Sequence, residues 1–226
     1  SHDLRTPLSV ITGAASGLKE SLDTLTPLAR GELIESILEE SQRMNRLIRN
    51  LLDMIRVETG SLQVQKEWQP LEDAIGVALI RMGERLKGHK VEVHLPADLP
   101  LAPLDAVLLE QVFINLLENA AKYTPVGTAI TISASAGPGV VTVSVADEGP
   151  GIPPGEEESI FEKFNRGSGA ESGKGIGLGL TISRGIVMAH GGKIWAENRR
   201  GGGAIFRFTL PLSGPAPLPI PEEVEG

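Results

Sequence analysis

The sequence predicts an α-helical hairpin followed by an α/β two-layer sandwich. In the first sixty positions, apolar residues recur at alternating spacings of four and three, the pattern of helices that pack on other helices. After about residue 60, short runs with strand-like alternation are interleaved with helical patterns, which favours a layered α/β unit.

Two seams of apolar residues define the hairpin. The first runs from residue 4 to residue 22 and the second from residue 34 to residue 55, with turn-forming residues 23–27 between them. The positions are Leu4, Leu8, Ile11, Ala15, Leu18 and Leu22, and then Ile34, Ile37, Ser41, Met44, Ile48, Leu51 and Ile55. Because two helices bury only one stripe each, we expect a second copy to complete a four-helix bundle, which makes the protein a homodimer.

The rest of the chain alternates strand and helix signals. Strands are predicted over residues 62–66, 91–95, 129–134, 140–145, 192–196 and 205–210, and helices over residues 71–87, 105–123 and 176–189. Residues 149–174 are rich in Gly, Pro, Ser and Glu and are expected to form a functional lid. The predicted domains are the hairpin (1–60) and the sandwich (61–212), followed by a Pro-rich, acidic and disordered tail (213–226).

Composition and charge exclude several classes of function. The formal net charge of −8, without a clustered basic face, argues against direct binding of nucleic acid. Zero cysteines exclude disulfides and thiolate metal sites and suit a reducing cytoplasm. No apolar run approaches the roughly 20 residues that cross a bilayer, and the first residue is Ser rather than Met. We expect a cytoplasmic piece of a longer, membrane-anchored protein.

Amide and carboxylate side chains fall where a nucleotide could use them. A predicted helix that begins with Asp105 carries Asn115 and Asn119 one turn apart on one face, where their oxygens can reach Mg²⁺ or its water shell. Asp147 follows an apolar strand, and its carboxylate can accept the exocyclic amine of adenine while Gly149 and Gly151 let backbone come close. These features predict an adenine nucleotide with Mg²⁺.

A glycine-rich segment offers a place for phosphates. Gly175, Gly177 and Gly179, followed by Leu180, open a predicted helix whose free N–H groups and positive dipole end face an anion. Alternating glycines alone more often reflect close packing or a turn. The dinucleotide fingerprint would need Gly at position 180, the P-loop would need Ser or Thr at position 175, and the protein-kinase His-Arg-Asp loop is missing. Taken together, the segments favour ATP with Mg²⁺ as cofactors.

A histidine lies at the start of the first predicted helix, outside its apolar seam. A neutral ring nitrogen of His2 can attack a γ-phosphate in line, while Asp3 can hold the other ring N–H and stabilise the developing positive charge. Thr6 shares this helix face and could orient a water for the reverse hydrolysis. A lone histidine at a helix end is more often incidental, so this prediction depends on the nucleotide segments downstream.

Five segments, in this order, resemble motifs of the catalytic core of bacterial two-component sensor histidine kinases. Residues 1–8 resemble the H box, 111–124 the N box, 147–151 the first glycine box, 161–164 the F box and 175–180 the second glycine box. The resemblance covers nearly all residues up to about 212 and implies a sandwich of the Bergerat, or GHKL, ATPase type. Residues 196–211 look most like the potassium-responsive KdpD group of the family.

The resemblance also implies roles for the matching residues. His2 would be the phosphoacceptor, Asp3 its general base, and Thr6 the residue that orients water for phosphatase activity. The residues implied for ATP and Mg²⁺ are Asn115, Asn119 (the metal ligand), Lys122, Tyr123, Asp147, Gly149, Gly151, Arg166, Gly175, Gly177, Gly179 and Leu180. The phosphoryl group would pass from ATP to histidine and then to an aspartate of a response regulator, KdpE-like if the group assignment holds. Asn165 departs from the aromatic residue often found after the F box.

Two other interpretations remain open at the level of sequence. The same sandwich serves ATPases of the gyrase, MutL and Hsp90 type, which use an acid to activate water. The matching position here is Asn115, whose amide has no basic oxygen, and this disfavours direct hydrolysis. The chain could instead act without catalysis, as a dimeric docking platform for a response regulator.

Overall fold

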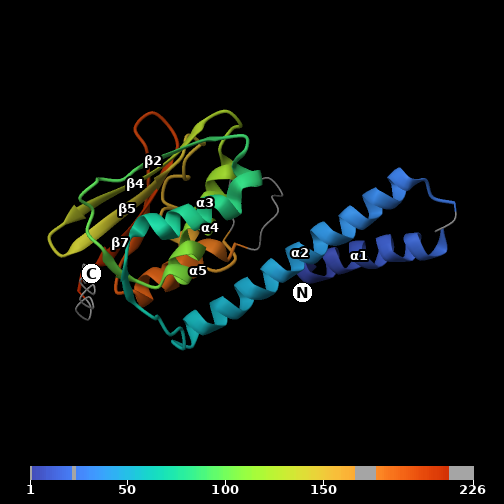
Figure 1. Cartoon of the computed structure of the whole chain (residues 1–226), viewed down its shortest axis with the longest axis horizontal. Coiled ribbons are helices and arrows are strands. Elements are labelled where there is room, and N and C mark those ends of the chain that lie inside the picture. Colours follow the sequence, from blue (N-terminus) through green and yellow to red (C-terminus); the bar gives the residue numbers. More distant parts are fainter. Residues whose placement is uncertain (1, 22–23, 166–176, 214–226) are drawn as a thin grey trace, which may run out of the picture.

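A long helical hairpin projects from a two-layer α/β sandwich (Figure 1), the fold class that the sequence predicts. The computed structural model describes residues 2–21, 24–165 and 177–213, and for His2, Asp3 and Leu4 it describes the helical backbone. In the described part of the chain, none of the helices combines the length and apolar character that a membrane crossing requires.

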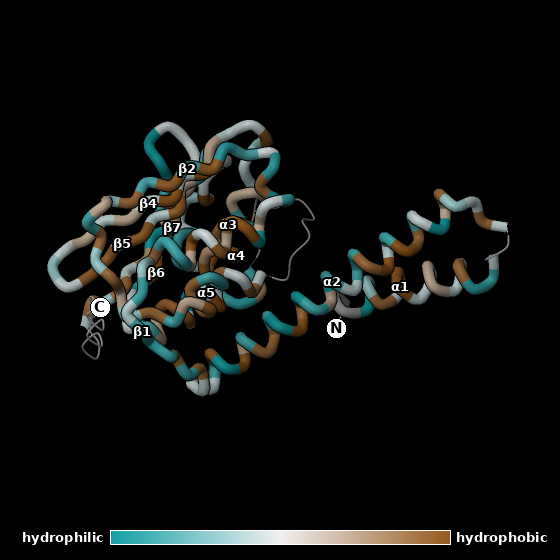
Figure 2. The backbone as a smooth tube through the Cα atoms, in the orientation of Figure 1, coloured by the Kyte–Doolittle hydropathy of each residue, from teal (hydrophilic) through white to brown (hydrophobic). Residues whose placement is uncertain are grey.

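The hairpin consists of α1 (His2–Glu20) and α2 (Pro27–Glu58). Thr26 caps α2, because its side chain accepts the N–H of Ala29 at 3.2 Å and Pro27 takes the first helical position. Many large apolar side chains of both helices stay exposed, and Figure 2 shows that hydrophobic residues recur along the hairpin. They are Leu8, Val10, Leu28, Ile34, Leu38, Ile48, Leu51, Leu52 and Ile55. The hairpin therefore presents an uncovered apolar face.

A five-stranded mixed sheet forms one layer of the sandwich. Its order is β2-β4-β5-β7-β6, with β2 parallel to β4 and the other neighbours antiparallel. A separate two-stranded antiparallel sheet pairs β1 with β3. The strands are β1 (Glu67–Gln69), β2 (Lys90–His94), β3 (Ala102–Leu104), β4 (Ala129–Gly137), β5 (Val140–Ala146), β6 (Ile194–Asn198) and β7 (Ala204–Pro211).

Three helices cover one face of this sheet (Figure 1): α3 (Leu71–Leu86), α4 (Ala106–Tyr123) and α5 (Gly179–Ala189). Alternate residues of β5 and β7 are buried, as the period of two of a half-covered strand requires. The rings of Phe113 and Phe208 meet edge to face at a centroid distance of 5.7 Å, which joins α4 to β7 in the core.

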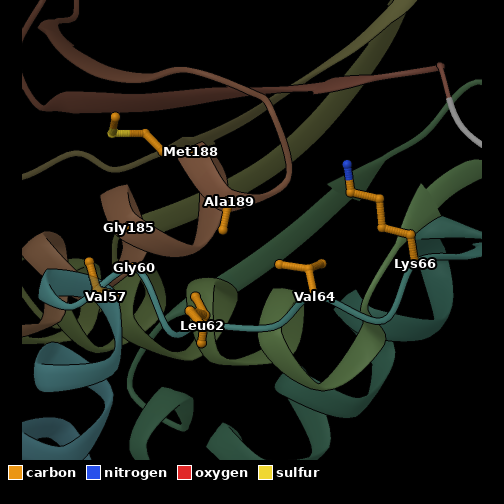
Figure 3. Close-up of a pocket in the computed structure, with 8 residues that line it drawn as sticks. All are labelled: Val57, Gly60, Leu62, Val64, Lys66, Gly185, Met188 and Ala189. Atoms are coloured by element: carbon orange, nitrogen blue, oxygen red, sulfur yellow. The ribbon is translucent and has the colours of Figure 1, made fainter.

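The prediction of a strand over residues 62–66 is wrong. This segment forms no strand, and pairing starts only at β1, with the unpredicted β3 as its partner. Lys66 instead donates its Nζ to the carbonyl O of His190 at 2.8 Å, and the N–H of Gln65 binds Asp105 Oδ2 at 3.1 Å. The apolar alternation reflects packing along a groove between the end of α2 and α5 (Figure 3). The groove is lined by Val57, Gly60, Leu62, Val64, Lys66, Gly185, Met188 and Ala189.

The second half of α2 is bound to the sandwich. Gln111 of α4 donates its Nε2 to Asp53 Oδ2 at 2.9 Å, and Lys163 forms an ion pair with Glu58. These contacts join the hairpin to α4 and to the segment that follows the short 3₁₀ helix η1 (Ser159–Phe161).

His190 links the end of α5 to the start of α4. Its side chain is buried, Nδ1 lies 2.8 Å from the carbonyl O of Ile186, and Nε2 lies 3.0 Å from the backbone N of Asp105. Because a backbone N–H only donates, Nε2 is the acceptor and Nδ1 carries the proton. Burial lowers the pKa of His190 below its ordinary value, and Lys66 acts in the same direction. The folded form therefore holds a neutral ring.

We expect this junction to make stability depend on pH. The unfolded chain takes up a proton on His190 below about pH 6.5, the ordinary pKa of histidine, whereas the lowered pKa delays protonation in the folded protein. The stabilisation is therefore fully present above about pH 6.5 and is lost as the pH falls toward the folded-state pKa. Urea unfolding across this range should show a decrease in the free energy of unfolding that is smaller in His190→Asn. Equal decreases in the two proteins would contradict this assignment.

Candidate functional site

The predicted amides lie where α4 meets the start of α5. Asn115 is buried, and its Nδ2 donates to the carbonyl O of Gly179 at 3.1 Å and to Ser183 Oγ at 3.2 Å. Its Oδ1 accepts no hydrogen bond from any residue in the described ranges. The side chain of Asn119, one turn further along α4, is half-buried and also forms no hydrogen bond with the described residues. Both amide oxygens therefore remain available for a ligand or metal.

Asp147 follows β5, and only one of its two carboxylate oxygens accepts hydrogen bonds from the described residues. Its Oδ1 accepts the N–H of Gly149 at 2.8 Å and the N–H of Ala204 at 3.2 Å. Only 6% of the residue is exposed, and within the described part of the chain Oδ2 accepts no hydrogen bond. Arg199 fixes the backbone by donating Nη1 to the carbonyl O of Asp147 at 2.9 Å. Oδ2 can thus accept a donor such as an exocyclic amine.

The glycines after Asp147 permit close backbone packing. A Cβ on Gly149 would lie 2.9 Å from the carbonyl O of Tyr123, at the end of α4. Gly151 has a φ of +81°, and a Cβ there would lie 2.5 Å from Asn198 Oδ1. The Asn198 amide pairs with the backbone of Ile152, accepting its N–H at 2.7 Å and donating to its carbonyl at 2.8 Å. Both glycines are needed to hold this loop against α4 and β6.

The start of α5 is positioned by backbone contacts with the predicted F box. The N–H of Phe164 binds the carbonyl O of Gly177 at 3.1 Å, and a Cβ on Gly177 would lie 2.5 Å from the carbonyl O of Asn165. Leu180 packs against the core. Among the described residues, no side chain caps α5 at Leu178, so with respect to this part of the chain the first-turn N–H groups keep their anion-binding capacity. Gly175 and Arg166 lie outside the described residues.

The predicted F box is anchored to the sandwich. Phe161 is buried, and its ring meets that of Phe206 edge to face at 6.4 Å. Thr181 of α5 donates its hydroxyl to the carbonyl O of Phe161 at 3.0 Å. Asn165, the departure from the family pattern, donates Nδ2 to the carbonyl O of Ser159 at 2.6 Å and so holds the end of this segment.

The remaining predicted residues occupy two further places. Lys122 and Tyr123 are exposed at the end of α4, with Lys122 Nζ 2.8 Å from Tyr123 Oη and 4.5 Å from the ring centroid. His2 and Asp3 begin α1, and Thr6 follows one turn later with an exposed side chain. In Figure 1 the N-terminal end of α1 lies along α2, outside the sandwich.

Several residues that support the site were not identified from the sequence. Ser183 holds the Asn115 amide, Asn198 holds the loop after Asp147, and Arg199 binds the Asp147 carbonyl. Asn198 and Arg199 lie in the 196–211 segment that resembles the KdpD group, but the resemblance gave them no role, and Ser183 lies outside the five motifs. Asn198 and Arg199 reach Asp147 because β7 pairs with both β5 and β6. Only a prediction of this strand pairing would have indicated their roles.

Comparisons with known proteins identify the family to which the chain belongs. A family model described as "Histidine kinase-, DNA gyrase B-, and HSP90-like ATPase" matches residues 104–214, and one described as "His Kinase A (phospho-acceptor) domain" matches residues 1–60. The solved catalytic domain of the histidine kinase ThkA is 31% identical, with a TM-score of 0.57, over 67% of this chain and 97% of that chain. The chain therefore belongs to the histidine kinase family.

Within that family the chain is similar to sensor protein KdpD. The Escherichia coli K12 protein is 45% identical over 214 residues, which cover 93% of this chain but only 23% of the longer KdpD protein. A structure of histidine kinase ThkA in complex with the response regulator protein TrrA matches 94% of this chain and 59% of that chain, with 27% identity and a TM-score of 0.70.

The donor set fits Mg²⁺ bound together with a nucleotide. The described residues contain no group of three or more His, Asp or Glu that could hold a metal ion alone. Two amide oxygens on one helix face suit a hard cation that keeps several waters and takes its remaining ligands from phosphates. Asn115 and Asn119 would hold the ion, and Asp147 would hold the base.

Gly203 offers a test of how tightly the Asp147 loop is packed. A Cβ at Gly203 would lie 2.0 Å from the carbonyl O of Asp147, whereas a Cβ at Gly202 would meet nothing within 4 Å, although both have a positive φ. Gly202→Ala should therefore cost about 1–2 kcal/mol of unfolding free energy, from backbone strain alone. Gly203→Ala should cost distinctly more, because the loop must also move. Equal losses in urea unfolding would show that the contact is unimportant.

Proposed function

We propose that this chain transfers the γ-phosphoryl group of Mg·ATP to His2 and then to an aspartate of a response regulator. The proposal is supported by the contacts that α4, which carries Asn115 and Asn119, makes with both glycine motifs: Asn115 Nδ2 donates to Gly179 at the start of α5, and a Cβ on Gly149, beside Asp147, would lie 2.9 Å from the carbonyl O of Tyr123. A hairpin that begins with a histidine is bound to the same unit.

In the proposed reaction, a ring nitrogen of His2 attacks the γ-phosphorus and the bond to the β–γ bridging oxygen breaks, so ADP leaves. Asp3 holds the other ring N–H and stabilises the positive charge that develops on the imidazole. Mg²⁺, when bound, offsets the charge of the phosphates. Thr6 orients water when the phosphorylated regulator is hydrolysed.

The same arrangement disfavours an ATPase that hydrolyses ATP directly. At the position where such an enzyme needs an acid, the amide nitrogen of Asn115 is occupied by two hydrogen bonds to α5. Its oxygen is a weak base, so it can orient a ligand but cannot take a proton from water.

The proposed partners follow from the hairpin and from the family. The exposed apolar residues of α1 and α2 would be covered by a second copy in a four-helix bundle, which makes the active form a homodimer. The ThkA–TrrA complex supports a response regulator as the phosphoryl acceptor. Similarity to KdpD favours a KdpE-like regulator and a cytoplasmic position within a membrane-anchored parent protein.

Phosphorylation of His2 is tested by label transfer. Incubation with γ-³²P-ATP and Mg²⁺ should give protein-bound label that is stable in alkali and lost in acid, as a phosphoramidate is. His2→Gln should abolish the label without weakening ADP binding, because His2 is not part of the nucleotide site. Label that persists in His2→Gln would refute the acceptor assignment.

Recognition of the base is tested at Asp147. In Asp147→Asn the retained oxygen can still accept the N–H groups of Gly149 and Ala204, while the group in place of Oδ2 becomes a donor that repels an exocyclic amine. ADP affinity measured by calorimetry should fall at least about tenfold, the equivalent of about 1.4 kcal/mol. Glu148→Gln removes the same charge from the exposed neighbour and should leave affinity unchanged. Similar losses in both variants would point to charge rather than base recognition.

A further inference from the structure

The orientation of the Asn115 amide is fixed by its partners on α5. The carbonyl of Gly179 can only accept a hydrogen bond, so the group 3.1 Å from it must be the nitrogen. The same nitrogen lies 3.2 Å from Ser183 Oγ. If the amide were flipped, Oδ1 would face the Gly179 carbonyl, and the two acceptors would repel each other. Oδ1 is therefore bonded to neither partner, and it lies 3.6 Å from the position that a Cβ on Gly179 would take.

Ser183 has no exposure to solvent and lies one helical turn after Gly179, so both acceptors are on one face of α5. A buried hydroxyl is costly unless it is hydrogen-bonded, and serine is a poor residue for a helix interior. If only a small side chain were needed at this position, alanine would fit with a lower cost in folding free energy. The hydroxyl therefore has a polar role, and the Asn115 amide is its partner in the described structure.

We propose that Ser183 is a positioning residue that acts through Asn115. It restrains the amide so that Oδ1 stays directed at the Mg²⁺–phosphate part of the ligand. This inference rests on the proposed function for the identity of the ligand, and it adds to that function a residue outside the nucleotide-binding motifs. Removing the hydroxyl leaves the amide with a single hydrogen bond and lets it rotate.

The nucleotide-free protein provides the first test. The ¹⁵N–¹H signals of the Asn115 side-chain NH₂ should shift in Ser183→Ala, and their exchange with water should accelerate at least about threefold. Thr209→Val is the matched control. It removes a hydroxyl that accepts the N–H of Lys193 at 2.9 Å, on β7 and without contact to Asn115, so the amide signals should not change. Unchanged Asn115 signals in Ser183→Ala would overturn the proposal, whether or not the protein binds ATP.

The second test uses ADP affinity with and without Mg²⁺, measured by calorimetry. In Ser183→Ala, affinity should fall about three- to tenfold with Mg²⁺ present and change less than about twofold in EDTA, since the base is held elsewhere. In an Asn115→Ala background, the same substitution should have no further effect. A loss that is equal in EDTA, or that persists in the Asn115→Ala background, would refute the positioning role. Absence of ADP binding in the unsubstituted protein would refute the proposed function. The Asn115 NH₂ signals in Ser183→Ala would then still show whether Ser183 restrains the amide.

Discussion

The contact between α4 and α5 at Asn115 is the constraint on which the site depends. One amide nitrogen joins the middle of α4 to the first two turns of α5 through Gly179 and Ser183. A Cβ at Gly179 would make an ordinary van der Waals contact with Asn115 Cγ at 3.5 Å, so the two helices approach each other closely there. The register of the two helices decides where the free N–H groups of α5 lie relative to the amide oxygens of α4.

Glycine contributes to the site mainly through close packing. Gly149, Gly151 and Gly177 each place backbone within a distance that a side chain would block. In this way the Asp147 loop is fixed against the end of α4, and the start of α5 against the F box. Such tight contacts leave the Asp147 carboxylate in one orientation, with Oδ2 ready to accept a donor without reorganisation.

Local patterns predicted most of the fold and the motif residues, but not the long-range contacts. The periodic apolar residues predicted the hairpin and α3, and Asp105 was expected at the start of α4, where its side chain does cap the helix. The strand prediction for residues 62–66 was wrong because every second side chain there lines a groove, and this alternation resembles that of a strand. The buried position of His190 has no local signature in the sequence, because its bond to Asp105 spans 85 positions.

The same limit applies to the site. Asn115 could be singled out because it shares a helix face with Asn119, and Asp147 because it follows an apolar strand next to two glycines, whereas Ser183 and Asn198 look like ordinary helix and strand residues. Their roles arise from the pairing of elements that are distant in sequence, here α4 with α5 and β5 with β7, which also pairs with β6.

A crystal structure of the dimer with Mg²⁺ and a non-hydrolysable ATP analogue is the most direct measurement of the central proposition. It should show the adenine amine on Asp147 Oδ2, both amide oxygens of α4 directed at the metal or its waters, and phosphate oxygens at the start of α5. A nucleotide bound elsewhere, or an Asn115 amide whose nitrogen faces the metal, would contradict it.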